Sequence, residues 1–347
     1  MRVNSCTTLR MDKPNTVFFQ RKTFPTGQYS LELIFADIRN RLEGKILPEV
    51  FESRFYSRGI FRRIYNSFEV TFNQGDVNIV TGDINYVSLF LKKRKTALVV
   101  LDCGYTASDK GLRVWLERLF WLRIPAVCSS KIVAISEFTK NEFIAETGCD
   151  PAKIVVIPIQ LFEQYKCHLK SFCAEKPVLL QVGEAENKNL ERVIRAIQGM
   201  SVRLSIVGKL SRHNMQQLRR ADINYENKYN LTEKEMLRAY IDCDMLVFPS
   251  TYEGFGMPII EAQATGRPVV ASNLGPMPWV AGGAACLVDP FSVESIRAGI
   301  EKVITNGEFR ENLITRGLEN VKRFHPDRIA NLYLDVINDI VAQSDSL

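Results

Sequence analysis

Two glutamates, Glu253 and Glu261, stand eight positions apart in YEGFGMPIIEAQATGRPVVAS, the stretch of residues 252–272. Two glycines and a proline lie between them, and the stretch holds a single further charged residue. Ionised carboxylates accept strong hydrogen bonds from hydroxyl groups. Gly254 and Gly256 permit the backbone torsions and the close approach that a bound ligand demands. The pattern therefore predicts a loop that binds a hydroxyl-rich molecule.

The elements on either side of this loop place it over the start of a helix. The sequence predicts a strand over 244–250 and a helix over 258–265, with Pro258 at its first position and Gly266 at its end. A helix N-terminus presents unpaired N–H groups and a positive dipole end, which favour a phosphate. In an open α/β sheet, ligands bind in the crevice beyond the carboxyl ends of the strands. We therefore expect an anion site at this loop.

Two carboxylates beside an anion site need a ligand that offers more than phosphate. Glu253 is expected before the loop, and Glu261 in the first turn of the helix. A sugar joined through a diphosphate to a ribose has hydroxyl groups at both ends and phosphates in the middle. This shape fits the order of acidic and glycine residues in the loop.

Both halves of the chain alternate between short apolar runs, rich in β-branched residues, and helix-length patterns. This alternation is typical of parallel strands joined by crossover helices. In the second half we expect strands over 177–183, 202–208, 244–250 and 267–272. In the first half we expect strands over 16–22, 77–83, 97–102, 131–136 and 153–158, with helices over 29–42 and 112–123. The predicted fold class is α/β, with two Rossmann-like doubly wound domains.

The boundaries of these domains follow from where the periodicity is lost. We place an N-terminal domain at residues 1–160 and a linker without strong periodicity at 161–176. A C-terminal domain follows at 177–325, and a long helix at 326–347 begins with a proline at its first position.

Composition excludes several classes of protein. The 347 residues are 46% hydrophobic and 24% charged, which is enough for a large core. There is no signal-peptide pattern and no run of about 18 apolar residues, so we expect a cytoplasmic protein. Eight cysteines without a CxxC pair indicate reduced thiols. The three histidines show no ligand spacing, and Asp242-Cys243-Asp244 precedes a strand instead of ending one, so no metal is expected.

The net charge of +6 is concentrated in the first half. Residues 1–175 carry 25 Lys and Arg against 18 Asp and Glu, whereas residues 176–347 carry 20 against 21. Such a surplus is compatible with nucleic acid, with an anionic membrane surface or with ordinary solvated faces. Two segments, 54–66 and 111–123, also mix basic with aromatic residues. In the second, apolar side chains share one helical face, which suits a membrane interface and equally a core helix.

The glutamate loop is part of a longer series of motifs. EGFGMPIIEA, TGRPVVAS and VAGGAACLVDP, in this order, resemble the donor-site signature of glycosyltransferase family 4, which comprises group 1 type, retaining enzymes of the GT-B fold. VGEAENKNLERVIRA, IVGK, ISEFTK and KIVVIP extend the resemblance, which covers residues 130–330 well and 1–130 loosely. It implies two domains that face each other across a cleft. The C-terminal domain would bind a nucleotide sugar, the N-terminal domain the acceptor, and the last helix would cross back to the N-terminal domain.

The resemblance also implies roles for individual residues. Glu261 matches the glutamate that binds the ribose hydroxyls, and Glu253 the one that faces the donor sugar. Lys188 matches the lysine that neutralises the departing phosphates. Backbone N–H groups that contact the sugar and the diphosphate are expected, beside Gly254, at Phe255, Gly256 and Met257.

Positive charge near the phosphates departs from the family pattern. Relatives carry an arginine a few residues before the lysine, but GEAENK has none. Arg192, Arg195 or Lys209 would then supply the second cation, and Lys209 is expected where strand 202–208 ends. Gly27, in PTGQYS, is expected in a flexible loop that approaches the phosphates from the opposite domain.

A second departure concerns the N-terminal side of the cleft. Relatives commonly have His-Asp where VVLDCGY has Leu101 and Asp102. The histidine usually contacts the donor sugar near its reacting carbon, so only Asp102 of this pair is retained as a catalytic candidate.

The resemblance implies a retaining enzyme that moves a hexose-type sugar from a nucleoside diphosphate to a saccharide or polyprenyl-linked saccharide, in the assembly of cell-surface polysaccharide. No metal or other cofactor is expected. The resemblance also implies a peripheral position on the inner face of the plasma membrane. The alternative is a catalytically impaired subunit that binds a sugar nucleotide within a complex, which Leu101 motivates. A dinucleotide-dependent oxidoreductase would share the sheet type, but no GxGxxG follows a first strand. Nucleic-acid binding would depend on charge alone, so no nucleic-acid partner is expected.

Overall fold

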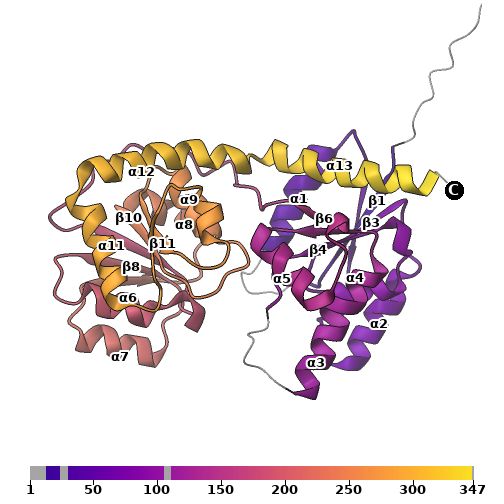
Figure 1. Cartoon of the computed structure of the whole chain (residues 1–347), viewed down its shortest axis with the longest axis horizontal. Helices are drawn as coiled ribbons and strands as arrows, with labels where there is room; N and C mark the ends of the chain where they lie inside the picture. Colours follow the sequence, from indigo (N-terminus) through magenta and orange to yellow (C-terminus); the bar gives the residue numbers. More distant parts are fainter. Residues whose placement is uncertain (1–12, 24–29, 105–110, 346–347) are drawn as a thin grey trace, which may run out of the picture.

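Two parallel six-stranded sheets form the two domains of the protein (Figure 1). The computed structural model describes residues 13–23, 30–104 and 111–345. The N-terminal sheet has the order β2-β1-β3-β4-β5-β6 and consists of β1 (Asn15–Gln20), β2 (Leu47–Glu52), β3 (Val77–Val80), β4 (Thr96–Val100), β5 (Lys131–Ala134) and β6 (Ile154–Val156). The C-terminal sheet has the order β12-β11-β10-β7-β8-β9 and consists of β7 (Val178–Val182), β8 (Arg203–Val207), β9 (Tyr225–Lys228), β10 (Met245–Phe248), β11 (Val269–Ser272) and β12 (Cys286–Val288). The predicted fold class is confirmed.

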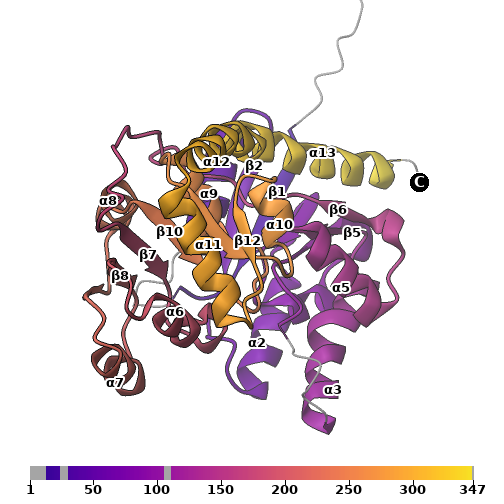
Figure 2. The ribbon, with the colours of Figure 1, turned by 60° about the vertical axis from the view of Figure 1, so that its left-hand side comes forward.

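Helices cover the sheets, so the central strands are buried. The strands β3, β4, β10 and β11 consist of buried residues throughout. Continuous apolar runs of this kind are what a parallel sheet with both faces covered requires. Figure 2 shows α11 (Val293–Thr305) across the face of the C-terminal sheet, where it contacts β11 and β12.

The helices of the N-terminal domain are α1 (Ser30–Leu42), α2 (Ile60–Val70), α3 (Leu112–Arg118), α4 (Ile124–Cys128) and α5 (Glu137–Thr147). Short 3-10 turns, η1 (Asn85–Phe90), η2 (Lys93–Lys95) and η4 (Pro151–Lys153), precede or follow its strands. The C-terminal domain carries α6 (Leu190–Ile197), α7 (Arg212–Arg220), α8 (Glu233–Asp242), α9 (Met257–Ala264), α10 (Met277–Ala281), α11 and α12 (Gly307–Asn320), with the turns η5 (Glu186–Lys188) and η6 (Val321–Phe324).

The last helix, α13 (Pro326–Asp345), leaves the C-terminal domain and packs along α1 of the N-terminal domain (Figure 1). Arg41 of α1 holds this crossing in place. Its guanidinium group forms ion pairs with Asp327 of α13 and with Glu163 of the linker, at 2.5 Å each. One arginine therefore ties both segments that cross between the domains to the same helix.

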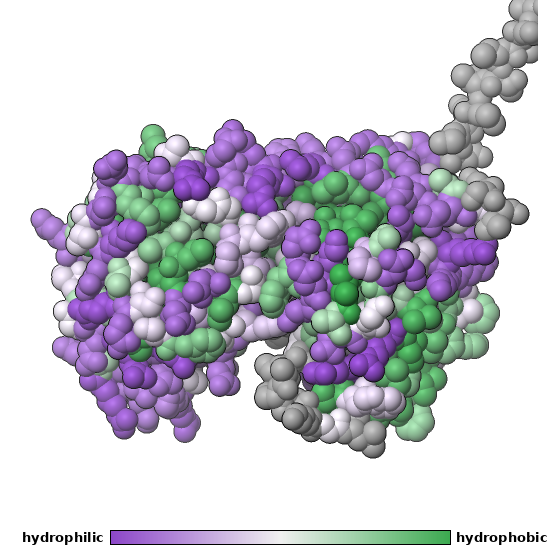
Figure 3. Space-filling model, viewed as in Figure 1, coloured by the Kyte–Doolittle hydropathy of each residue, from purple (hydrophilic) through white to green (hydrophobic). Residues whose placement is uncertain are grey.

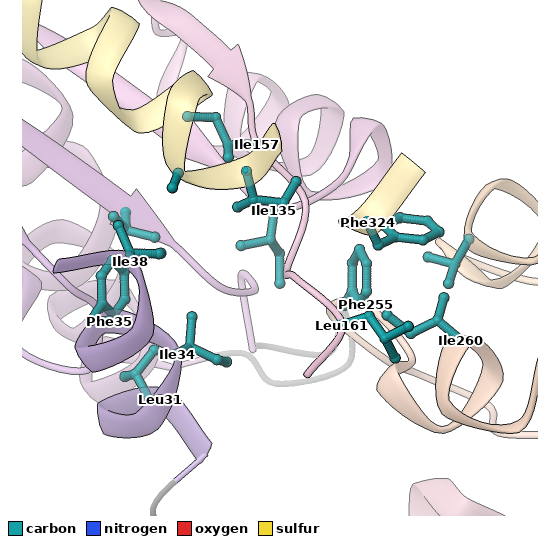
Figure 4. Close-up of a cluster of buried hydrophobic side chains, with 14 of the residues drawn as sticks. Leu31, Ile34, Phe35, Ile38, Ile135, Ile157, Leu161, Phe255, Ile260 and Phe324 are labelled. Atoms are coloured by element: carbon teal, nitrogen blue, oxygen red, sulfur yellow. The ribbon is translucent and has the colours of Figure 1, made fainter. Parts of the chain in front are cut away.

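One hydrophobic cluster extends across both domains (Figure 4). Phe35 and Ile135 belong to its N-terminal part, whereas Phe255 and Phe324 come from the C-terminal domain and the start of the crossing. Phe255 lies in the loop between Glu253 and Glu261, so its packing against Trp279 and Phe324 helps to fix the position of that loop.

Two predictions about helices need correction. The helix expected from residue 258 begins at Met257, because Gly256 with φ 107° acts as its N-cap, so Glu261 is the fifth helical residue and lies in the second turn. The helix expected over 112–123 is α-helical only to Arg118 and continues as the π-helix η3 (Leu119–Arg123). The apolar face expected for this helix is only partly buried: Leu122 is 1% exposed, whereas Trp115 is 50% exposed.

Candidate functional site

The loop between β10 and α9 lies at the carboxyl edge of the C-terminal sheet. The loop after β7 supports it: the side chain of Asn187 donates a hydrogen bond to the carbonyl of Tyr252 at 2.9 Å, and Thr251 N–H donates to the Asn187 carbonyl at 2.8 Å. Among the described residues, the backbone N–H groups of Phe255 and Gly256 have no acceptor. The loop thus presents free donors at the start of an eight-residue helix.

Lys188 and Glu253 form an ion pair at the edge of the loop. The Lys188 ammonium lies 2.6 Å from the Glu253 carboxylate, and the two side chains are 22% and 12% exposed. The lysine side chain crosses Gly183, where a Cβ atom would lie only 2.8 Å from it, and its ammonium is 5.1 Å from the centre of the Phe248 ring. The end of β7 therefore requires a glycine so that the lysine can lie across it.

The N-terminal domain meets the loop at Gly254. A Cβ atom at this position would lie 2.4 Å from the Leu101 carbonyl oxygen and 3.1 Å from Cβ of Asp102. The Gly254 carbonyl accepts hydrogen bonds from the hydroxyl groups of Ser136 and Thr139, at 3.2 Å each. The glycine expected to approach a ligand closely is therefore also a point of close contact between the two domains.

Asp102 follows β4 and faces the same loop. Desolvation raises the pKa of this carboxyl, and the negative charges of Asp83 and Glu253 raise it further. A cavity of about 200 Å³ adjoins it, with Asp83, Asn85 and Trp121 among its lining residues. Asp102 thus lies close enough to Glu253 for their charges to interact, and Asp83 joins them as an acidic residue that the sequence did not single out.

Tyr252 forms a second bridge between the domains. Its hydroxyl group accepts a hydrogen bond from the backbone N–H of Gly104 and donates one to Glu142, both at 3.3 Å. Burial is the main cause that raises the pKa of Glu142. Tyr252 stands directly before Glu253, so its position in the loop was visible, but its partners are too distant in the sequence to be inferred.

Glu261 lies away from Lys188 and has partners of its own. The hydroxyl group of Tyr240 donates to its carboxylate at 2.6 Å, and Tyr165 also forms a hydrogen bond to it. Desolvation raises the pKa of Glu261 to about 7, although both tyrosines act to lower it. The two glutamates therefore lie in separate environments: Glu253 pairs with Lys188, whereas Glu261 is held by two tyrosines.

The raised pKa of Glu261 predicts how stability depends on pH. Below about pH 4.5 the carboxyl is protonated in both the folded and the unfolded chain, so Glu261→Gln should match the wild type. As the pH rises from 4.5 to 7, the unfolded carboxyl ionises while the folded one stays protonated, and the wild type should lose about 2 kcal/mol relative to the variant, because one pKa unit corresponds to about 1.4 kcal/mol and Glu261 is partly solvated; above about pH 7 the difference should stay constant. Urea unfolding at pH 4.5, 6, 7 and 8 measures this difference. The exposed Glu311→Gln variant should show no such trend, and a pH-independent difference for Glu261→Gln would contradict the assignment.

The remaining expected residues lie in several places. The side chain of Phe255 is buried against Phe324, with ring centres 5.7 Å apart, so only its backbone faces a ligand. Lys209 is exposed beyond the end of β8. Met257 is the first residue of α9. Gly27 lies outside the described residues.

In the segment Asp242-Cys243-Asp244, the carboxylate of Asp244 is bound by other residues of the protein. The Asp244 carboxylate accepts hydrogen bonds from the backbone N–H groups of Cys173 and Val178 and pairs with Lys170 at 2.9 Å. Within 13–23, 30–104 and 111–345, no group of three His, Cys, Asp or Glu side chains has an arrangement suited to a metal ion. None of the helices described has the length and apolar character needed to cross a membrane.

The chain resembles known proteins over parts of its length. Residues 170–320 match the family model of glycosyl transferases group 1. O-antigen chain mannosyltransferase B of Escherichia coli is 39% identical over 92 residues, which are 26% of this chain and 24% of that protein. The capsular polysaccharide biosynthesis glycosyltransferase CapM of Staphylococcus aureus is 25% identical over 272 residues, 70% of this chain and 69% of CapM. The chain spans a quarter or less of the length of mannosyltransferase B and of the Escherichia coli mannosyltransferase WbdA, which it matches over 14%.

Solved structures resemble the whole fold. The Anabaena protein HepE, in complex with UDP and glucose, has a TM-score of 0.75 at 16% identity and covers 93% of this chain and 99% of its own. WaaG, a glycosyltransferase involved in lipopolysaccharide biosynthesis, has a TM-score of 0.70 with the same coverage and identity. The fold is therefore GT-B. Residues 170–320, which match the group 1 family model, make up most of the C-terminal domain of this fold.

Proposed function

We propose that the protein is a retaining glycosyltransferase of family 4 that transfers a hexose-type sugar from a nucleoside diphosphate to a saccharide or lipid-linked saccharide. The observation that carries the proposal is the Lys188–Glu253 ion pair beside the free N–H groups of Phe255 and Gly256, directly opposite Asp102. Cation and N–H donors suit a diphosphate, and the flanking carboxylates suit hydroxyl groups.

The leaving group explains why a lysine is needed here. When the bond from the sugar to the diphosphate breaks, the diphosphate gathers negative charge and the sugar becomes positive, as an oxocarbenium-like species. Lys188 and the loop N–H groups then stabilise charge that is larger in the transition state than in the bound donor. Glu253 would release Lys188 to the diphosphate and turn to the sugar hydroxyls. This arrangement would not require a metal ion.

The acceptor would enter from the N-terminal domain. Asp102, with its raised pKa, lies opposite Glu253 and beside the 200 Å³ cavity, where an acceptor hydroxyl group would approach the reacting carbon. The contact of Gly254 with Leu101 and Asp102 closes this edge of the cleft. Closure excludes water that would hydrolyse the donor.

A panel of nucleotide sugars tests this function. UDP- and GDP-linked glucose, galactose, mannose and N-acetylglucosamine are suitable probes, because HepE binds UDP and glucose and several curated relatives are mannosyltransferases. One donor is expected to raise the melting temperature, to release its nucleoside diphosphate, and to give a product with the anomeric configuration of the donor by NMR. Protection by a nucleotide without any release would instead favour the impaired binding subunit, which Leu101 in place of the family histidine motivates. Release with an inverted product would contradict a retaining mechanism.

A position at the inner face of the plasma membrane is supported by α2. This helix buries Asn66 and Ser67 and exposes Ile60, Phe61 and Phe68, at 68%, 84% and 59%. Exposed aromatic residues next to arginines are typical of a helix that lies in a membrane interface. We therefore include a peripheral membrane location, reached from the cytoplasm, in the proposed function.

A further inference from the structure

Three cavities of the N-terminal domain share a single lining residue, Trp121. It lies in the π-helical turn η3, and such turns occur frequently at functional sites. The guanidinium carbon of Arg63 lies 4.4 Å from the centre of its ring, and the Tyr86 ring lies 5.1 Å away. Trp121 therefore forms a wall between cavities that differ in chemistry.

The largest cavity is apolar. It measures about 420 Å³, within the range of about 300–1,000 Å³ that is usual for small-molecule sites. It lies between α2, η1 and the segment from α3 to η3, and its apolar lining includes Ile60, Ile64, Phe90, Leu116 and Phe120. Figure 3 shows the hydrophobic surface of the domain gathered over α2. This cavity suits a hydrocarbon chain.

The second cavity, of about 280 Å³, is cationic. Arg21, Lys22 and Arg58 line it against a single carboxylate, that of Asp83. The Lys22 ammonium donates to the backbone carbonyl of Arg54 at 3.1 Å and lies 5.3 Å from the centre of the Tyr56 ring, which are neutral partners. Arg21 already pairs with Asp83 and with Glu32, so Lys22 is the cation that would meet a phosphate in this cavity.

The third cavity is the 200 Å³ space beside Asp102. Asn85 lines it and is 5% exposed. Its amide nitrogen donates to the Trp121 carbonyl at 3.0 Å, but its amide oxygen has no hydrogen-bond partner within the described part of the chain. A buried acceptor without a partner needs a donor, and a sugar hydroxyl group provides one.

We propose that the three cavities form one acceptor site, for a saccharide linked through phosphate or diphosphate to a hydrocarbon chain. This inference rests on the proposed function and selects the lipid-linked class of acceptor. The cavities follow the order of such a molecule: the saccharide lies beside Asp102, the phosphate beside Lys22, and the chain in the apolar cavity. Asp83 lines both polar cavities, and Trp121 lines all three, so the cavities adjoin one another at this ring.

Dodecyl phosphate, held below its critical micelle concentration, is the probe for the phosphate and chain parts of this site. Isothermal titration calorimetry should show that the wild type binds it at least tenfold more tightly than inorganic phosphate. Leu116→Asp places a carboxylate in the apolar cavity and should weaken dodecyl phosphate binding at least tenfold without changing inorganic phosphate binding. Lys22→Ala should weaken both.

Phe61→Ala is the matched control, because Phe61 lies on α2, whose Ile60 and Ile64 line the apolar cavity, but is itself 84% exposed and does not line it. It should bind dodecyl phosphate as the wild type does. Equal weakening by Phe61→Ala and Leu116→Asp, or wild-type binding by Leu116→Asp, would overturn the inference. Each variant is also titrated with UDP, which would bind at the separate donor site. A variant that retains UDP binding is folded. Absence of UDP binding in the wild type would count against UDP as donor nucleotide, and leave the dodecyl phosphate result decisive for the acceptor site.

Discussion

Replacing Lys188 by methionine is expected to lower kcat/KM for the nucleotide sugar by about 10²- to 10³-fold. Methionine keeps an unbranched side chain that can cross Gly183, but it removes the charge that neutralises the departing diphosphate. The Lys188 side chain lies across Gly183 at the end of β7, and its ammonium is 2.6 Å from the Glu253 carboxylate at the edge of the loop. Steady-state kinetics with the donor selected by the panel measures the loss.

A loss of stability could imitate this result, since the Glu253 carboxylate is only 12% exposed and would lose its partner. The double variant Lys188→Met/Glu253→Gln removes both charges and should unfold at a urea concentration closer to that of the wild type, while its kcat/KM stays low. Lys234→Met, on the exposed face of α8, should leave both quantities unchanged. Wild-type kcat/KM in Lys188→Met would exclude the lysine from the reaction.

The sequence was sufficient for features that depend on local patterns. The parallel strands could be predicted because a sheet covered on both faces needs continuous apolar runs, as in β4 and β10. The loop with Glu253 could be predicted because a strand, two glycines and a proline fix its path over a helix start. The exact start of the helix could not be predicted. Gly256 caps α9, so the helix begins at Met257, one residue earlier than expected, and Glu261 lies in its second turn.

Features that depend on contacts between distant segments were not predictable in this way. Tyr165 and Tyr240 carry no local signal, and only the packing of the linker and α8 against α9 brings them to Glu261. The same holds for Ser136 and Thr139, which reach Gly254 across 118 and 115 residues. The sequence indicated basic and aromatic character in 54–66 and 111–123, but not that the two segments enclose a cavity.

Gly254→Ala should separate donor binding from turnover. The new methyl group would lie 2.4 Å from the Leu101 carbonyl, a distance that a Cβ atom does not tolerate, so the N-terminal domain must move away from the loop. Displacement of reacting groups by about 1 Å costs about 10²-fold in rate, so kcat should fall by about 100-fold. The proposed nucleotide contacts belong to the C-terminal domain, so UDP affinity should stay within about threefold of the wild type. Kinetics and calorimetry of the same sample provide both values.

Gly307→Ala provides the matched control for this steric argument. Gly307 begins α12, and a Cβ atom there would meet only the Arg310 side chain at 3.5 Å, an ordinary contact distance. This variant should keep wild-type kcat and UDP affinity. If Gly254→Ala turned over donor at the wild-type rate, the contact between Gly254 and Leu101 would have no part in closing the cleft. If it lost UDP binding to the same degree as kcat, the glycine would act within the donor site alone. Only the predicted split, with low kcat and retained affinity, makes the position of the N-terminal domain against this loop a condition for reaction.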